Sequence, residues 1–240
     1  MRISKKKMPL LINDHPLIKH KMTILRDVTT STKDFRSVLK EITFYLGYEA
    51  SRELEIQSKS INTPLTSFEG SKLAETISII PILRAGLGMS ETMSELIPSA
   101  AIHHIGMYRC KTSMLPIQYY NRLPRDKISD VSFIMEPCIA TSNTIHAVIN
   151  ILKRWGCKKI IIISAIGAKS GVDRVLDAHP DVSIYIGAID EHLSESGMII
   201  PGIGDAGDRQ FGTPNDEVPN LLPDGFSPDK NTKADNKRKR

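Results

Sequence analysis

Four consecutive isoleucines at positions 160–163 constrain the fold of this chain more strongly than any other feature of its sequence. Neighbouring residues of a β-strand point to opposite faces of a sheet, so a strand made from this run is apolar on both faces. Such a strand belongs in the centre of a parallel sheet that is covered by helices on both sides. The run therefore predicts an α/β protein.

Apolar segments and helical patterns alternate on both sides of this run. Strands are expected over 77–83, 101–108, 160–163 and 182–189, and a further one begins at Val131. Helices are expected from about Thr32, over 86–96, between Ile145 and Gly156, and over 172–178. Repeated β-α-β units imply a doubly wound, mostly parallel sheet with helices on both faces. Ligands of such sheets bind beyond the carboxyl ends of the strands.

The length of 240 residues fits one α/β domain with extensions. We expect an irregular leader over 1–13, the domain over 14–214, and a mostly disordered tail over 215–240, where Pro, Asp, Asn and Lys dominate. Within the domain, 63–66 suggests an extended edge segment and 110–130 an excursion or flexible hairpin.

Charge and cysteine content argue against several classes of protein. The formal net charge is +5, and much of the basic excess lies at the two ends. Such runs are more often solvated tails than nucleic-acid sites, and no apolar run is long enough to span a membrane. Cys110, Cys138 and Cys157 lack C-x-x-C spacing, and the histidines lack metal-type spacing. We therefore expect a cytoplasmic protein without disulfides or a metal site of its own.

Residues 131–144 predict an anion site. A short apolar run ends at Glu136, a loop of small and hydroxyl residues follows, and a helix then begins. Free N–H groups and the dipole at a helix N-terminus favour phosphate, and an acid at the strand end can accept hydrogen bonds from sugar hydroxyls. The expected ligand is a phosphorylated sugar. The alternative is an ordinary strand-to-helix connection with an N-capping Thr or Ser.

Two arginines and a glycine-rich segment stand at other expected strand ends. Arg84, followed by Gly86 and Gly88, can clamp a diphosphate, whereas Arg109 taken alone is more often a solvated charge. Residues 199–213 combine dense glycine with paired acids, which predicts a shaped loop rather than a strand or a helix. A surface turn cluster or a calcium loop is the alternative for that segment, although the spacing does not fit an EF-hand.

These segments together resemble the type I phosphoribosyltransferases, in particular the uracil phosphoribosyltransferase family, from residue 14 to 214. The loop at 137–144 matches the family's phosphoribosyl-diphosphate (PRPP) loop at Pro137, Ala140, Thr141 and Thr144. Glu136 replaces an Asp of the family pattern, and Ser142-Asn143 replaces Gly-Gly. Residues 81–88 resemble the diphosphate loop, and residues 199–213 resemble the hood that binds uracil. The hood would span about 190–214.

The resemblance implies a glycosyltransferase of pyrimidine salvage that converts uracil and PRPP into UMP and diphosphate. Catalytic roles fall on Arg84, Arg109 and Asp205. PRPP binding falls on Arg84, Arg109, Glu136, Pro137, Cys138, Ile139, Ala140, Thr141, Ser142, Asn143, Thr144 and Asp205. Uracil binding falls on Ile199, Gly204, Asp205 and Ala206. The family further implies Mg²⁺ bound mainly through PRPP, GTP binding and a homo-oligomer.

Two alternatives remain at this stage. A degenerate homologue would hold PRPP or nucleotide with little turnover, because Ser142-Asn143 replaces glycines that allow positive φ. An RNA-binding pyrimidine regulator is favoured only by the basic termini, without interleaved aromatic residues. Cys138 near a helix N-terminus could have a lowered pKa, but a small packing residue is the favoured interpretation.

Overall fold

The computed structural model describes residues 9–109 and 116–213. The elements follow one another as β1 (Leu10–Ile12), α1 (Pro16–Arg26), α2 (Thr32–Ala50), η1 (Ser51–Glu53), β2 (Ile56–Asn62), β3 (Ser67–Leu73), β4 (Ile77–Leu83), α3 (Leu87–Leu96), β5 (Ala101–Ile102), β6 (Ile105–Arg109), β7 (Pro116–Asn121), β8 (Val131–Met135), β9 (Cys138–Ile139), α4 (Asn143–Trp155), β10 (Lys159–Ala168), α5 (Lys169–Ala178), β11 (Ser183–Asp190), β12 (His192–Leu193), β13 (Ile199–Ile200) and α6 (Ala206–Phe211).

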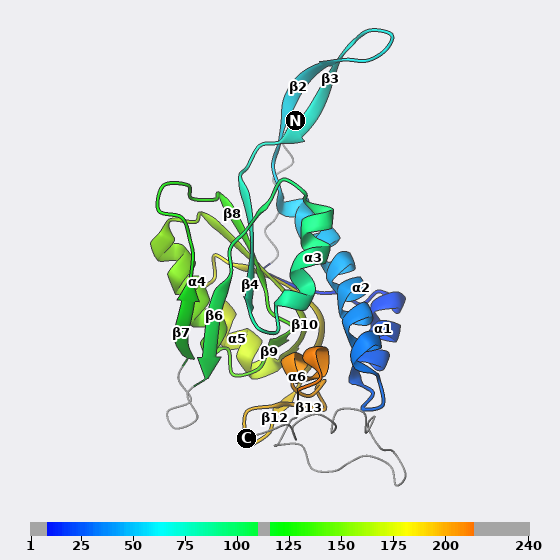
Figure 1. The fold of residues 1–240 in the computed structure, drawn as a ribbon, viewed down its shortest axis with the longest axis vertical. Coiled ribbons are helices and arrows are strands. Elements are labelled where there is room, and N and C mark those ends of the chain that lie inside the picture. The colour runs from blue at the N-terminus through cyan, green and yellow to red at the C-terminus, as the bar shows by residue number, and fades with distance from the viewer. Residues whose placement is uncertain (1–8, 110–115, 214–240) are drawn as a thin grey trace, which may run out of the picture.

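One large sheet forms the centre of the molecule (Figure 1). Its strands lie in the order β1-β11-β10-β8-β4-β6-β7, and every pair along this path is parallel except β6 with β7. Helices α1, α2 and α3 cover one face, while α4 and α5 cover the other. The doubly wound α/β fold expected from the sequence is confirmed.

The isoleucine run lies in β10, between β8 and β11. Ile161 and Ile163 belong to the core beneath α1 to α3, whereas Ile160 and Ile162 belong to the core beneath α4 and α5. All four are almost fully buried. The prediction of a central strand with two apolar faces is therefore confirmed, and this strand joins the two cores of the domain.

The N-terminal region departs from the expectation. Residues 10–12, expected to be irregular, form β1, which pairs with β11 at the edge of the sheet. Helix α1 was not predicted, because only Ile18, Met22 and Leu25 of its eleven residues are buried. Its start nevertheless carries a signal, since Pro16 occupies the first turn and the His15 ring accepts a hydrogen bond from the N–H of Leu17.

Other corrections concern connections. The segment 63–66, expected to be extended, forms the turn of the β2–β3 hairpin, with the Thr63 hydroxyl accepting from the Leu65 and Thr66 N–H groups. The strand expected over 101–108 is split into β5 and β6 at His103 and His104. For 110–130, expected as an excursion or flexible hairpin, the hairpin alternative fits in part, because β7 pairs antiparallel with β6. Residues 110–115 and the tail expected over 215–240 lie outside the described residues.

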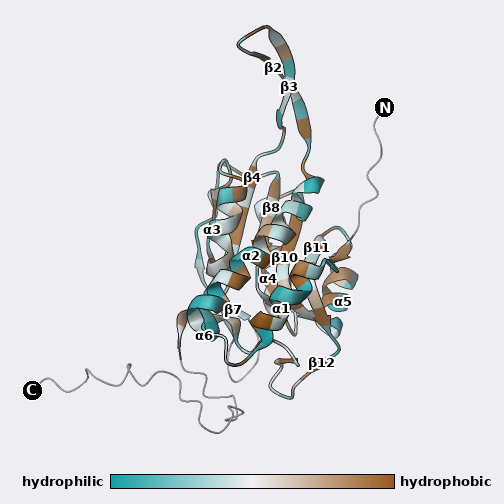
Figure 2. Ribbon diagram, turned by 90° about the vertical axis from the view of Figure 1, so that its right-hand side faces the viewer, coloured by the Kyte–Doolittle hydropathy of each residue, from teal (hydrophilic) through white to brown (hydrophobic). Residues whose placement is uncertain are grey.

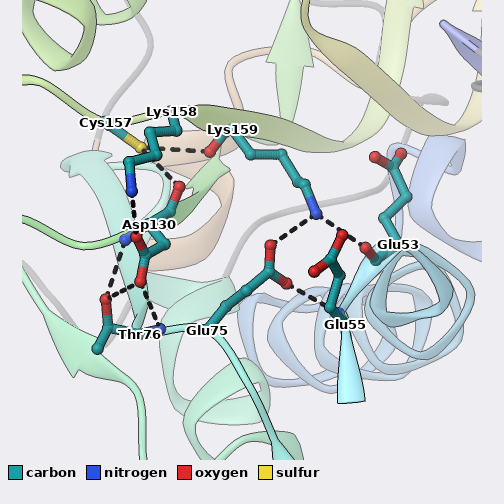
Figure 3. Close-up of polar contacts among 8 residues, drawn as sticks. All are labelled: Glu53, Glu55, Glu75, Thr76, Asp130, Cys157, Lys158 and Lys159. Atoms are coloured by element: carbon teal, nitrogen blue, oxygen red, sulfur yellow. Dashed lines mark hydrogen bonds and ion pairs between the residues drawn. The ribbon is translucent and has the colours of Figure 1, made fainter. Parts of the chain in front are cut away.

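The β2–β3 hairpin projects far from the body of the molecule (Figure 2). Polar contacts fix its base at the amino ends of the central strands (Figure 3). Lys159 Nζ lies 2.8 Å from Glu75 Oε1 and 2.9 Å from the Glu53 carbonyl, and Glu75 also accepts from the Glu55 N–H. No helix in the described parts of the chain has the length and apolarity needed to cross a bilayer.

Candidate active site

A cavity of about 670 Å³ opens at the carboxyl ends of the central strands. The loop after β8 forms one wall, and the segment between β12 and α6 forms the other. The lining residues are Ala85, Glu136, Cys138, Ile139, Ala140, Thr141, Ser142, Thr144, Ile145, Glu195, Ser196, Gly197, Met198, Ile199, Ile203, Gly204, Asp205, Ala206 and Gly207. The fold thus brings together residues from 136–145 and 195–207, two segments that lie far apart in the sequence.

The loop between β8 and α4 has the geometry of an anion site. Ser142 lies in the left-handed region with φ 66° and ψ −6°, and no other non-glycine residue of the described chain has a positive φ. It precedes the first turn of α4, whose leading N–H groups have no acceptor within the helix and lie at the positive end of its dipole. The strand, loop and helix expected over 131–144 are confirmed. Ser142 also takes up the conformation for which glycine is the usual residue.

Glu136 lies at the strand end, where part of its surface meets the cavity. Dense packing around the carboxyl removes it from water, and this desolvation, together with the nearby charge of Asp205, raises the pKa of Glu136 to about 8, against the opposing hydrogen bond from the Cys138 N–H. The carboxyl group is therefore mostly protonated at neutral pH until a ligand supplies hydrogen-bond donors or positive charge.

Cys138 packs against the core beneath α1 to α3. Burial raises the pKa of its thiol well above the ordinary value, and the negative charges of Glu136 and Asp205 raise it further. The idea of a lowered pKa at this helix N-terminus is therefore wrong, and the packing interpretation is the one that fits.

Arg84 follows β4 and faces the hood. Its Nη2 lies 3.1 Å from Asp208 Oδ1, and 54% of its side chain is exposed, so the guanidinium can exchange this carboxylate for a phosphate group. Arg109 is the last residue of β6, the neighbouring strand. Its backbone therefore ends at the same edge of the sheet as Arg84, while its side chain lies outside the described part of the structure.

The glycine-rich segment contains more regular structure than expected. Residues 199–213 were predicted to form neither strand nor helix, but β13 pairs with β12 and a short helix, α6, follows. Asp205 caps α6 by accepting from the Asp208 N–H, and Gly212 ends it with φ 66°. Six residues are too few to give a helical period in the sequence, although the Asp cap and the Gly stop are both visible there.

Two glycines shape the turn that leads into α6. Gly202 has φ 63°, and a Cβ on it would lie 2.1 Å from the carbonyl oxygen of Ile199. Gly204 has φ 72° and lines the cavity. Ala206, the first residue of α6, has a backbone N–H that the helix leaves without an acceptor. The turn therefore presents backbone donors and acceptors to the cavity.

Three residues that hold this segment in place were missed by the sequence analysis. Arg26 forms a two-pronged ion pair with Asp190, at 2.8 and 2.7 Å, and donates to the Gly202 carbonyl. Arg209 donates to the Leu25, Asp27 and Ile203 carbonyls. Gln210 donates to the Ala85 carbonyl and so ties α6 to the loop that carries Arg84. Partners up to 184 residues apart leave no local pattern in a sequence.

Comparison with known proteins decides the family. A family model described as uracil phosphoribosyltransferase matches residues 12–213. The chain belongs to the uracil phosphoribosyltransferase family. It is 46% identical to the uracil phosphoribosyltransferase of Agathobacter rectalis and 44% identical to that of Roseiflexus castenholzii, in each case over 85% of this chain and 98% of the relative. The structure of the AQ2163 protein from Aquifex aeolicus is similar, with a TM-score of 0.79 and 34% identity over 84% of this chain and 97% of that one.

The resemblance noted in the sequence is thereby confirmed. Most residues proposed for PRPP and uracil meet at the cavity, whereas Arg84, Pro137 and Asn143 do not line it and the side chain of Arg109 is not described. Glu195, Ser196, Gly197 and Met198 also line the cavity; they lie within the hood expected over about 190–214, but none of them was predicted as a binding residue. The only signal there is a Ser-Gly turn, in which Gly197 has φ 81°.

Proposed function

We propose that this chain transfers the phosphoribosyl group of PRPP to uracil, which gives UMP and diphosphate. The observation that carries the proposal is that one cavity lies between the loop after β8 and the hood. The chain is moreover a member of this family. One wall offers an anion site beside an acid, and the other offers backbone groups for a flat polar ring. The curated relatives bear the name of this activity, and nothing in the comparisons favours the degenerate homologue.

The hood is proposed to bind uracil through backbone groups. Uracil has an imide N–H between two carbonyls, which peptide donors and acceptors can pair without a charged side chain. We assign this pairing to Ile199, Gly204 and Ala206, at the end of β13, in the following turn and at the start of α6. The contacts of Arg26, Arg209 and Gln210 hold these backbone groups in fixed positions before the base arrives.

The loop after β8 is proposed to bind the sugar and its 5′-phosphate. Residues 137–144 surround the phosphate, whose charge is favoured by the N-terminus of α4. Glu136 accepts hydrogen bonds from the ribose hydroxyls once it is ionised. The bond from the anomeric carbon to diphosphate loosens before the uracil nitrogen attacks, so positive charge develops on the ribose. Catalysis in this scheme is positioning and charge stabilisation, without a covalent enzyme intermediate.

Arg84 and Arg109 are proposed to bind the diphosphate as it leaves. Arg84 releases Asp208 and turns its guanidinium to the diphosphate, for which it offers a forked pair of donors. Asp205 lines the cavity in the hood wall and is proposed to contact PRPP next to the base. Arg109 stays a prediction from the resemblance.

Mg²⁺ is proposed to arrive with PRPP. In the described parts of the chain, no three His, Cys, Asp or Glu side chains lie close enough to hold a metal ion. Glu136 and Asp205 are two carboxylates at one cavity, which suits an ion that takes one or two protein carboxylates and otherwise substrate oxygens and water. The ion would neutralise the diphosphate charge.

We also propose a homo-oligomer, with the β2–β3 hairpin as part of its interface. A two-stranded hairpin is at best marginally stable in water by itself. This one exposes several large apolar side chains, namely Ile56, Ile61, Leu65, Phe68 and Leu73. A second copy that covers them would account for the projection (Figure 2). A cytoplasmic location fits the free thiols of Cys138 and Cys157, while Cys110 lies outside the described residues and GTP binding stays a prediction.

The proposed function is tested by offering the purified chain PRPP, Mg²⁺ and three bases in parallel. Uracil should give UMP, and cytosine and hypoxanthine should react slower by roughly 10⁴ or more, because each leaves a backbone group of the hood unpaired. Comparable rates with cytosine or hypoxanthine would remove the assignment to uracil. PRPP binding without UMP would return the degenerate homologue to consideration.

A further inference from the structure

Helix α5 packs against the loop after β8, and none of its residues lines the cavity. At Gly171 its backbone comes so close that a Cβ would lie 1.9 Å from the Ala140 carbonyl oxygen. That contact leaves no room for any side chain. The first turn of α5 is therefore a rigid support for the middle of the loop.

Arg174 stands three residues later, on the same side of the helix. Its Nη1 lies 3.1 Å from the Thr141 carbonyl oxygen, and its Nη2 lies 3.3 Å from Asn143 Oδ1. The two acceptors belong to the residues immediately before and after Ser142. One guanidinium thus holds both neighbours of the residue with positive φ.

Ser142 needs such support for a physical reason. Its Cβ crowds the backbone in the left-handed region, so a free loop with this sequence favours other conformations. Its own hydroxyl does not cap α4 but donates to the Thr141 carbonyl at 2.6 Å. The Thr141 carbonyl therefore accepts from Ser142 and Arg174 together, which fixes the orientation of the peptide group that enters the strained residue.

The charge of Arg174 also has a consequence. A cation next to the N-terminus of α4 is unfavourable in the absence of an anion, since the helix dipole is positive at that end. Both terminal nitrogens of the guanidinium have acceptors in the loop, one a backbone carbonyl and the other the Asn143 side chain. An anion bound in the loop would relieve the repulsion while the brace stays in place.

We propose that Gly171 and Arg174 are positioning residues that hold the loop after β8 ready for the 5′-phosphate, and that the Arg174–Asn143 contact lets Ser142 stand where glycine is the easier choice. The inference rests on the proposed function for the identity of the ligand. It assigns no contact between Arg174 and the substrate. According to this proposal, the loop accepts Ser142 and Asn143 because α5 supports it, and not because of the loop sequence alone.

The test is a double-mutant cycle between Arg174→Met and the loop variant Ser142→Gly/Asn143→Gly, with the KM for PRPP as the main measurement. In the natural loop, Arg174→Met should raise this KM about tenfold, which corresponds to about 1.4 kcal/mol, with the KM for uracil and the thermal midpoint nearly unchanged. In the Gly-Gly loop the same substitution should change it less than about twofold, because the strain and the Asn143 acceptor are gone.

Two further variants sharpen the result. Lys169→Met removes the same charge from the same helix, where Lys169 pairs with Asp173 instead of the loop, and should leave the KM for PRPP within about twofold. Arg174→Lys should recover only part of the loss, since one ammonium group cannot serve both acceptors. An equal effect of Arg174→Met in both loops, or of Lys169→Met and Arg174→Met, would overturn the brace in favour of direct or long-range attraction of phosphate.

A failure of the proposed function would be distinguishable from a failure of this inference. If the wild-type chain binds PRPP by calorimetry but forms no UMP, the function is wrong and the same cycle, read as PRPP affinity, still decides the role of Arg174. If Arg174→Met binds PRPP as tightly as wild type, the inference is wrong whatever the turnover. If wild type binds no PRPP, both are wrong.

Discussion

The two ends of β8 carry acids with opposite properties. Asp130 precedes the strand at its amino end, where the hydroxyl and N–H of Thr76 and the ammonium of Lys158 lower its pKa to about 2 (Figure 3). Glu136 follows the same strand at its carboxyl end, where desolvation and Asp205 raise its pKa to about 8. Five residues, Val131–Met135, separate an acid with several hydrogen-bond and ion-pair partners from one whose single backbone hydrogen bond does not offset its desolvation.

The difference shows that the amino end of β8 stabilises the fold, whereas the carboxyl end is suited to bind a ligand. Asp130 adds stability above pH 3.8, and this contribution is lost as the pH falls through about 2. Glu136 acts in the opposite sense, because its ionisation disfavours the folded state as the pH rises from 4.5 through 8. A carboxyl group whose ionisation destabilises the ligand-free protein can be stabilised by hydrogen bonds that a bound ligand donates.

The largest effect should come from Arg84 at the carboxyl end of the neighbouring strand. Arg84→Ala should lower the rate of UMP formation by roughly 10² to 10³, because one donor to the departing diphosphate is lost. The thermal midpoint should change little, since the Arg84 side chain is about half exposed. Arg52→Ala removes an exposed, ion-paired guanidinium in η1, directly after α2, and serves as the control. Wild-type turnover in Arg84→Ala would remove this residue from the site.

An intermediate effect is expected at the support of the hood. Arg26→Met leaves Asp190 largely buried without its partner and should lower the free energy of unfolding by about 2 kcal/mol, less than for a fully buried pair because Arg26 is partly exposed. The KM for uracil should rise while that for PRPP stays near wild type, because the Gly202 carbonyl also loses its donor. Denaturant unfolding and initial rates measure the two effects. A change in the KM for PRPP alone would contradict the assignment of this hood to the base.

The smallest effect should come from the amino end of β8. Asp130→Asn should lower the free energy of unfolding by about 1 kcal/mol at pH 7, a value reduced for solvent screening at this accessible site. The thermal midpoint should fall by a few degrees. Neither KM should change. The stability difference from wild type should shrink as the pH falls from 3.8 towards 2. A difference that keeps its full size at pH 2 would mean that ionisation of Asp130 is not its source, and a shifted KM would mean that the two ends of β8 are not independent.

The layered fold was predictable from the sequence because local patterns determine its strands and helices. The isoleucines at 160–163, the apolar stripe of α2 and the stop at Gly156 each have a period or a conformation that a single segment reveals. The strand, loop and helix around residues 131–144 were predictable for the same reason. Helix α1 and the β2–β3 hairpin were not, because few of their residues are buried.

From the residues alone, the candidate site was predictable only as separate segments, and the resemblance joined them. The resemblance pointed to Glu136, Ser142 and the hood, and the structure places them around one cavity. Contacts between residues far apart in the sequence were not predicted. An example is the pair of Arg26 with Asp190, which are 164 residues apart. The pKa of Glu136 escaped as well, because it depends on packing and on Asp205, which the chain brings close only when folded.

The pH dependence of the KM for PRPP, measured between pH 7 and 9, tests most directly the claim that the carboxyl end of β8 receives this substrate. Phosphate groups titrate near pH 6, so in this window Glu136 is the group that changes. Ionised Glu136 accepts from the ribose hydroxyls, and a pKa of about 8 predicts that the KM falls about tenfold across the window. Glu136→Gln should abolish the dependence. A KM that is flat in wild type, or that falls equally in Glu136→Gln, would contradict the account.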